Sequence, residues 1–190
     1  LEIIRYYQYD HNYINTDNTV HFCENYGDVV FKWVDLLKQK NEYFKAIRFL
    51  IEAHDILGSL DIDGDEGQPY DLSYSMNEAF SDILLYMDIS ERKESFDLLR
   101  QHFYTMKNAS FKIDIVDTLL CRFIGDEYVE SQLDFVEEQY DYLGKYPSIF
   151  DREYMLNLFA NDYLELLEKN NASKKEIEAI YKKYWKCYSV

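Results

Sequence analysis

The sequence has few residues that interrupt helices and few that form cross-links. Its 190 residues include two prolines, six glycines and three cysteines. Because proline and glycine end or weaken helices, their scarcity favours long helices over strands joined by tight turns. Cys23, Cys121 and Cys187 are far apart, and no two of them form a C-x-x-C pair. This pattern fits neither a disulfide framework nor a zinc site, and it indicates reduced thiols and a cytoplasmic protein.

Long apolar segments are also missing. No uninterrupted apolar run approaches the ~20 residues that a membrane-spanning helix needs. The N-terminal residues lack the apolar segment and small-residue cleavage site of a secretory signal. We therefore expect no membrane span, no membrane partner and no signal peptide.

Basic residues are outnumbered by acidic ones. The chain has 20 Lys and Arg against 36 Asp and Glu, a formal net charge of −16. Such a chain repels phosphates, which excludes nucleic acid as a partner and favours a basic protein. No Lys or Arg lies between Arg48 and Arg92 or between Asp126 and Asp141, whereas the segment from Lys174 is net basic. We therefore expect a basic partner to approach the acidic middle of the chain.

Apolar residues recur with helical spacing from Asp28 onward. The first stripe consists of Val30, Trp33, Val34 and Leu37, and similar stripes follow to the C-terminal end. They predict an all-α fold of about eight helices whose short connections make antiparallel hairpins. The hairpins must stack to bury their apolar faces, either as an open α-solenoid or as a compact orthogonal bundle. We expect an irregular or partly helical lead-in over residues 1–27 and a single hairpin-repeat domain over residues 28–190.

Turn and capping residues set the expected helix boundaries. Residues 58–72 are rich in Gly and Asp and predict a loop. Ser75 with Glu78 and Ser173 with Glu176 have the spacing of capping boxes, in which each side chain bonds the backbone N–H of the other residue. Ser90 and Asp151 are expected to cap two further helices.

Residues 30–57 resemble a tetratricopeptide-repeat hairpin. The resemblance rests on Val30-x-x-Trp33-Val34-x-x-Leu37 followed by Tyr43-x-x-Ala46-x-x-x-Leu50-x-x-Ala53. Small residues stand where that family packs its two helices closely. Val34 replaces the family's Gly, residues 125–128 repeat the turn only weakly, and the family's period of about 34 residues does not hold. The resemblance implies a TPR-like array that binds proteins on a concave surface and carries no catalytic residues.

The dipeptide His54-Asp55 is similar to the metal-binding core of HD-domain phosphohydrolases, which are also all-α. In that family the adjacent His and Asp bind a divalent metal that activates water for phosphoester hydrolysis. The resemblance implies an upstream His, for which His21 is the candidate, and a downstream Asp, for which Asp114 or Asp117 is the candidate. The residues after Asp55 depart from the family's pattern. A metal-dependent HD-type phosphohydrolase is therefore the alternative function.

An acidic loop offers the candidate partner-binding residues. Its alternating carboxylates suggest a calcium loop, but an EF-hand needs Gly at the sixth position and Glu at the twelfth, where this chain has Glu66 and Leu72. We therefore interpret the loop as a solvated acidic turn that faces the partner. Its candidate residues are Asp61, Asp63, Asp65, Glu66 and Asp71.

These observations favour a non-catalytic protein-binding module without a cofactor. The 19 tyrosines suit protein interfaces, since each combines an apolar ring with a polar hydroxyl. The most specific version is an acidic inhibitor or immunity-type protein that covers the active site of a basic toxin such as a nuclease, with carboxylates imitating phosphates. A third interpretation is a regulatory or scaffold segment of a longer protein, since the chain begins with Leu1. The pattern leaves the oligomeric state open.

Overall fold

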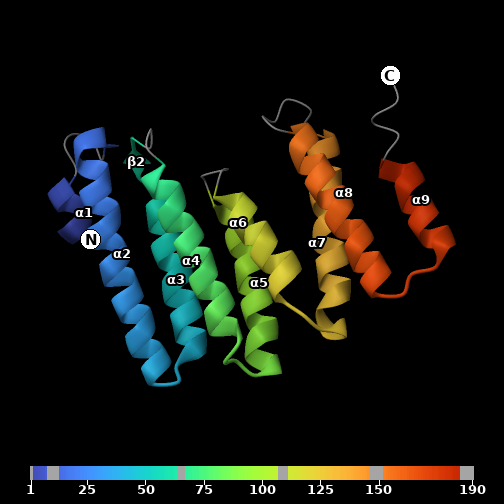
Figure 1. The fold of residues 1–190 in the computed structure, drawn as a ribbon, viewed down its shortest axis with the longest axis horizontal. Helices are drawn as coiled ribbons and strands as arrows, with labels where there is room; N and C mark the ends of the chain where they lie inside the picture. The colour runs from blue at the N-terminus through green and yellow to red at the C-terminus, as the bar shows by residue number, and fades with distance from the viewer. Residues whose placement is uncertain (1, 8–12, 64–66, 107–110, 146–151, 185–190) are drawn as a thin grey trace. The chain divides into compact units, whose positions relative to one another are not determined.

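The chain is almost entirely helical in the computed structural model, which describes residues 2–7, 13–63, 67–106, 111–145 and 152–184 (Figure 1). Within these ranges there are nine α-helices, one short π-helix and one pair of two-residue strands. The predicted all-α class with about eight helices is confirmed. The helices are α1 (Glu2–Tyr7), α2 (Thr16–Gln39), α3 (Tyr43–Ser59), α4 (Gln68–Leu84), α5 (Ile89–Thr105), α6 (Lys112–Asp117), the π-helix η1 (Thr118–Arg122), α7 (Asp126–Lys145), α8 (Arg152–Lys169) and α9 (Lys174–Tyr184).

Two compact units make up the chain, residues Leu1–Phe123 and Ile124–Val190. They are called unit 1 and unit 2 below. Whether they act as the predicted single domain over residues 28–190 stays a prediction. In the described part of both units, no helix combines the length and the apolar composition needed to cross a membrane.

Unit 1 is a stack of antiparallel helices. Successive helices from α2 to α6 alternate in direction (Figure 1). Each helix also packs against the next but one, α2 against α4, α3 against α5, and α4 against α6. Helices α2, α4 and α6 therefore form one layer, and α3 and α5 form the other. The apolar stripes of both layers meet in a continuous core.

Helix α2 begins at Thr16, earlier than the predicted start at Asp28. Asn15 caps it, because its side-chain oxygen accepts a hydrogen bond from the Asn18 N–H at 3.2 Å. The expected lead-in is helical here because residues such as Phe22 and Tyr26 supply a buried face. Gly27 lies inside the helix, where a Cβ atom would sit only 3.0 Å from a side-chain carbon of Leu72 on α4.

Trp33 does not lie in the core as its spacing predicted. Its side chain is 54% exposed, whereas Val30 and Val34 are buried. The buried stripe of α2 runs through Gly27, Val30 and Val34, because α3 and α4 both pack on that side. Trp33 projects beyond the edge of this stripe.

Two other helix starts differ from the prediction. Helix α4 begins at Gln68, after Gly67 in a left-handed conformation (φ 86°) and with Pro69 in its first turn. Ser75 is thus inside the helix, where its hydroxyl donates to the Asp71 carbonyl at 2.8 Å instead of capping. Helix α5 is capped by Asp88, which accepts from the Glu91 N–H at 2.9 Å, and not by Ser90. Proline in a first turn and Asp at an N-cap are both favourable, which explains both shifts.

Unit 2 contains helices α7, α8 and α9, with α8 packed against both others. Tyr140 on α7 donates its hydroxyl to the Leu156 carbonyl on α8 at 2.8 Å. The predicted Ser173–Glu176 capping box is confirmed: Glu176 accepts from the Ser173 N–H at 2.8 Å, and Ser173 accepts from the Glu176 N–H at 3.3 Å. Asp151, the expected cap of α8, lies outside the described residues.

The turns after α2 and α8 have the same local structure. Asn41 and Asn171 both adopt left-handed φ angles, 56° and 54°. In the first turn the Glu42 N–H donates to the Leu37 carbonyl at 2.9 Å, and in the second the Ala172 N–H donates to the Leu167 carbonyl at 2.9 Å. These bonds close the helix end as in a Schellman motif, in which asparagine is the main alternative to glycine.

Candidate protein-binding surface and buried histidine cluster

The predicted acidic loop is divided between structural and exposed residues. Asp61 lies in β2 (Asp61–Ile62), which pairs in parallel with β1 (Tyr13–Ile14), and its side chain is exposed. Asp71 is exposed in the first turn of α4. Asp65 and Glu66 lie outside the described residues. Only part of the predicted binding loop can therefore be placed.

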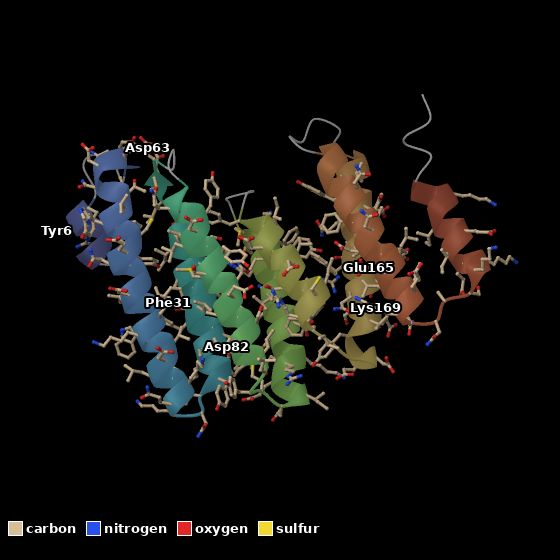
Figure 2. All side chains as sticks on the ribbon, viewed as in Figure 1. Tyr6, Phe31, Asp63, Asp82, Glu165 and Lys169 are labelled. Atoms are coloured by element: carbon tan, nitrogen blue, oxygen red, sulfur yellow. The ribbon has the colours of Figure 1, made fainter. Side chains whose placement is uncertain are left out.

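Asp63 holds this loop against the start of α2. Its carboxylate accepts hydrogen bonds from the hydroxyls of Tyr13, at 3.2 Å, and Thr16. Its carbonyl accepts from the Thr19 hydroxyl at 2.9 Å, and its N–H donates to the Ile14 carbonyl at 2.9 Å. Figure 2 shows Asp63 at the end of unit 1 where α2 begins. Its carboxylate is thus engaged within the fold.

The four residues of the HD-like pattern are not brought together. His21 is exposed on α2, with Nδ1 3.7 Å from a Glu24 carboxylate oxygen. Asp117 lies at the end of α6, 3.6 Å from Arg122. His54 is buried, and both of its ring nitrogens contact protein groups. Among the described residues, no group of three or more His, Cys, Asp or Glu side chains could hold a metal ion.

His54 instead belongs to a buried polar cluster that joins the two layers of unit 1. Its Nδ1 lies 2.9 Å from Nε2 of His102 on α5, and its Nε2 lies 2.7 Å from the Ser73 hydroxyl on α4. Ser73 is in turn 3.4 Å from a carboxylate oxygen of Asp114 on α6. At the other end, His102 Nδ1 is 3.0 Å from Asp55 Oδ1, although the N–H direction is not aligned for a hydrogen bond. We call this chain of five residues the histidine cluster.

Burial decides the charge state of the histidine cluster. His54 and Ser73 are fully buried, and His102 is 2% exposed. Removal from water and, to a smaller extent, the neighbouring His102 lower the pKa of His54 to about 3. Burial also lowers the pKa of His102, although Asp55 opposes this shift and Lys112 adds to it. Both imidazoles are therefore neutral at pH 7.

The negative charge of Asp55 sets the direction of the hydrogen bonds. It favours a proton on His102 Nδ1, so that His102 Nε2 accepts from His54 Nδ1–H. His54 Nε2 is then unprotonated and lies 2.7 Å from the Ser73 hydroxyl, whose single proton it shares with the Asp114 carboxylate, 3.4 Å away. Burial raises the pKa of Asp114, at the far end of the cluster. Each histidine thus has one donor and one acceptor nitrogen, as a neutral imidazole requires.

The sequence contains one signal for this cluster. His102 falls on the buried stripe of α5 between Leu99 and Met106, and His54 falls between Leu50 and Leu57 on α3. A histidine on a buried stripe needs a hydrogen-bonding partner. The partners come from other helices, and the two histidines are 48 residues apart, so no local pattern identifies them.

A row of exposed carboxylates runs along α7 in unit 2. Asp126, Glu130, Asp134 and Asp141 are all exposed. We call these four residues the acidic ridge. The first three are spaced by four residues, which places them on one side of the helix about 6 Å apart along its axis. In the part of the chain that the structure describes, none of the four takes part in an ion pair.

The acidic ridge costs helix stability. Like charges four residues apart destabilise a helix by about 0.2–0.5 kcal/mol per pair. Asp126 offsets some of this cost because it lies at the helix N-terminus. The remaining negative potential is available to a cationic partner.

Comparisons with known protein families, with curated proteins and with solved structures give no match, so the interpretation of these sites rests on their residues.

Proposed function

We propose that this protein is a non-catalytic binding module that uses the acidic ridge of α7 to bind a basic protein. The observation that carries the proposal is the row of exposed, unpaired carboxylates, which lowers helix stability and has no partner among the described residues. An extended negative surface accelerates association with a positive one and orients it. Asp61 and Asp71 add exposed negative charge on unit 1.

The packing of unit 1 supports a TPR-like role. Antiparallel helices that pack against the next helix but one, as α2, α3 and α4 do, are typical of stacked hairpin repeats, whose extended surfaces bind proteins. The histidine cluster gives no support to catalysis, since the Ser73 hydroxyl and both His54 nitrogens are enclosed. A cytoplasmic location agrees with the unpaired, reduced cysteines that the sequence predicts.

An inhibitor or immunity-type protein is the most specific form of this proposal. A row of carboxylates resembles a nucleic-acid backbone in the sign and regularity of its charge. A toxin nuclease that binds phosphates through Lys and Arg would therefore bind the ridge as well. Binding of this kind weakens as salt rises.

The test compares a ridge variant with a charge-matched control. The ridge variant carries D126N, E130Q, D134N and D141N, and the control carries D28N, E52Q, E94Q and D97N, which neutralise four exposed carboxylates of unit 1. The partner is captured from a lysate of the source cell at low and high salt, identified, and titrated against each variant. We expect the ridge variant to bind about tenfold more weakly or worse, with a flatter salt dependence.

The control variant should change the affinity by less than about threefold. Equal losses in both variants would mean that net charge matters and the ridge does not. Unchanged binding and salt dependence in the ridge variant would overturn the proposal. A further variant, D61N with D71N, measures the contribution of the acidic loop.

A further inference from the structure

A small cavity lies where α3 and α5 end. It is an open hollow in the surface with a volume of about 340 Å³, and the described residues that line it are Asp55, Ile56, Ser59 and Thr105, all of them exposed except Ile56. Ser59 is the last residue of α3, and Thr105 is the last residue of α5. Because successive helices alternate in direction, α3 and α5 run the same way and end on the same side of unit 1 (Figure 1). The C-terminal ends of two helices therefore border the cavity.

This position is electronegative. A helix C-terminus carries about half a negative charge on its free carbonyl groups, and two of them meet here. The Asp55 carboxylate adds a full charge and is 47% exposed. The last turn of α3 has no basic residue, and that of α5 has only His102, whose burial keeps it neutral. Basic side chains that usually compensate helix C-termini are thus absent from these two turns.

The polar side chains that the structure describes in the cavity can accept hydrogen bonds, but their own protons are already donated within the helices. The Ser59 hydroxyl donates to the Ile56 carbonyl at 2.8 Å. The Thr105 hydroxyl donates to the carbonyls of His102, at 3.1 Å, and Gln101, at 3.3 Å. Their remaining lone pairs, together with the Asp55 carboxylate, are acceptors. A ligand that matches this cavity must supply both positive charge and several donors.

A second observation shows that the position of Asp55 matters. His102 Nδ1 is a buried nitrogen that lies against the Asp55 carboxylate, which forms one wall of the cavity. That carboxylate oxygen, 3.0 Å away, is the polar partner of the nitrogen, so the placement of Asp55 decides how well the nitrogen is satisfied. A cation that holds Asp55 from the cavity side would fix the position of the carboxylate facing this nitrogen.

We propose that the cavity at Asp55 binds a primary alkylammonium group. Asp55 is the counter-ion, the hydroxyl oxygens of Ser59 and Thr105 accept two of the three ammonium protons, and Ile56 contacts the alkyl chain. This site does not depend on the acidic ridge or on the proposed function.

Other cations fit this cavity less well. Calcium takes six to eight oxygen ligands, and one carboxylate with two hydroxyls supplies too few. A guanidinium prefers both oxygens of a carboxylate, but Oδ1 of Asp55 already faces His102. A quaternary ammonium has no N–H donors and prefers an aromatic cage.

Binding at this cavity is coupled to the protonation of His102. An ammonium beside Asp55 repels a proton on the imidazole, so the two cations compete for one carboxylate. The other groups that face the histidine pair are Ser73 on α4 and Lys112 and Asp114 on α6, with Asp117 beyond Asp114. Lys112 also opposes a proton on His102. Acid should therefore weaken ammonium binding.

The ammonium can come from two sources, a free alkylamine or a lysine side chain of a protein. The first experiment titrates n-butylammonium chloride into the full chain and follows the imidazole nitrogen resonances of His102 by NMR. Tetramethylammonium chloride at the same ionic strength is the control, because it carries the charge without N–H donors. We expect a saturable shift with butylammonium and none with tetramethylammonium. Equal, unsaturable shifts with both salts would overturn the proposal.

Variants test the assigned roles. We expect D55N to weaken butylammonium binding at least tenfold and T105V about threefold, whereas D61N, which alters an exposed carboxylate outside the cavity, should bind like the parent. T105V keeps the size of the side chain, so it tests the site even if D55N perturbs the fold. Unchanged affinity in T105V and in folded D55N would overturn the assignment. The ridge variant should bind butylammonium normally, which separates this test from that of the proposed function.

A lysine peptide identifies the source. A short peptide with one central lysine is compared with the same peptide acetylated at that lysine, which removes the charge. Much tighter binding of the unmodified peptide than of butylammonium indicates a lysine side chain from a protein. Equal affinities indicate a free amine. Equal binding of the acetylated and unmodified peptides would contradict an ammonium site.

Discussion

The turns after α2 and α8 are alike, but the helices that follow them are stabilised differently. Both turns place an asparagine in the left-handed region and close with the same hydrogen bond. Helix α3 then begins without a side-chain cap, and Ala46, Ile47 and Leu50 on it are fully buried. Helix α9 begins with a capping box, and none of its side chains with a described placement is buried. The same turn thus precedes one helix held by the core and one held by its own terminus.

This difference shows what a local sequence signal can and cannot determine. Burial of a side chain such as Leu50 contributes about 1.5–3 kcal/mol, whereas a cap contributes about 1 kcal/mol. A helix with a strong core face can therefore form without a cap, as α3 does. In α9, where none of the described side chains is buried, the cap supplies a larger share of the stability.

The largest effect is expected when one apolar residue is truncated in each of the two helices. We expect Leu50→Ala on α3 to lower the free energy of unfolding of unit 1 by about 3 kcal/mol, because it leaves a cavity in the core. Ile177→Ala on α9 should cost less than about 1 kcal/mol, since that side chain is only partly covered. Urea denaturation followed by Trp33 fluorescence and by hydrogen exchange measures both. Similar losses in the two variants would contradict the comparison.

Acid should destabilise unit 1 more than unit 2, because all four histidines lie in unit 1. Folding lowers the pKa of His54 from 6.5 to about 3. Between these two pH values, His54 is protonated in the unfolded chain and neutral in the folded one. Stability is complete above pH 6.5 and falls as the pH drops toward 3. At about pH 4.5 the loss from His54 alone is on the order of 3 kcal/mol, and His102 adds to it.

The measurement is the free energy of unfolding against pH, with hydrogen exchange to distinguish the units. His54→Gln should reduce the number of protons taken up on unfolding, which sets the slope of the unfolding free energy against pH, by about one. This holds whatever its effect on overall stability. His21→Ala, which alters an exposed histidine, should leave the slope unchanged. A parent protein whose unit 1 is equally stable at pH 7 and pH 4.5 would show that the histidines are not held neutral.

The smallest expected effect concerns the cap of α9. Hydrogen bonds from Ser173 lower the pKa of Glu176, so acid should break this cap only at a lower pH than it would protonate a free glutamate. Ser173→Ala should lower the stability of α9 by about 1 kcal/mol and speed amide exchange in its first turn. Glu42→Ala, at the uncapped start of α3, should change the free energy of opening that amide exchange measures there by less than about 0.5 kcal/mol. An equal effect at both helix starts would show that α3 also depends on local capping.

The sequence predicts the architecture well because the architecture depends on composition and period. Scarce glycine and proline, apolar stripes and the Ser173–Glu176 box identified the all-α class and one helix start correctly. The start of α2 was predicted too late because residues 16–27 show no clean apolar period, and the buried face becomes evident only once α3 and α4 pack against it. Trp33 was misplaced for the same reason, since the width of a buried stripe depends on its neighbours.

The candidate sites were predicted less completely. His54 and Asp55 stood out as a dipeptide, but the partners of His54 come from α4 and α5, and only the folded chain identifies them. Asp63 was expected to face a partner because the sequence does not show that Tyr13 and Thr16 bind its carboxylate. The acidic ridge could have been found from its four-residue spacing, and the cavity at Asp55 could not, because it requires two helix ends to meet.

The pairing of β1 with β2 has a consequence for the order of folding. It joins Tyr13 with Asp61 and Ile14 with Ile62, residues that lie on either side of the α2–α3 hairpin in the sequence. Contacts this distant form slowly unless the intervening chain is already compact. Docking of α3 on α2 brings the two segments together, so the strand pair should assemble late in refolding. Its hydrogen bonds should accordingly gain exchange protection after those of the two helices, and it should open first when unit 1 begins to unfold.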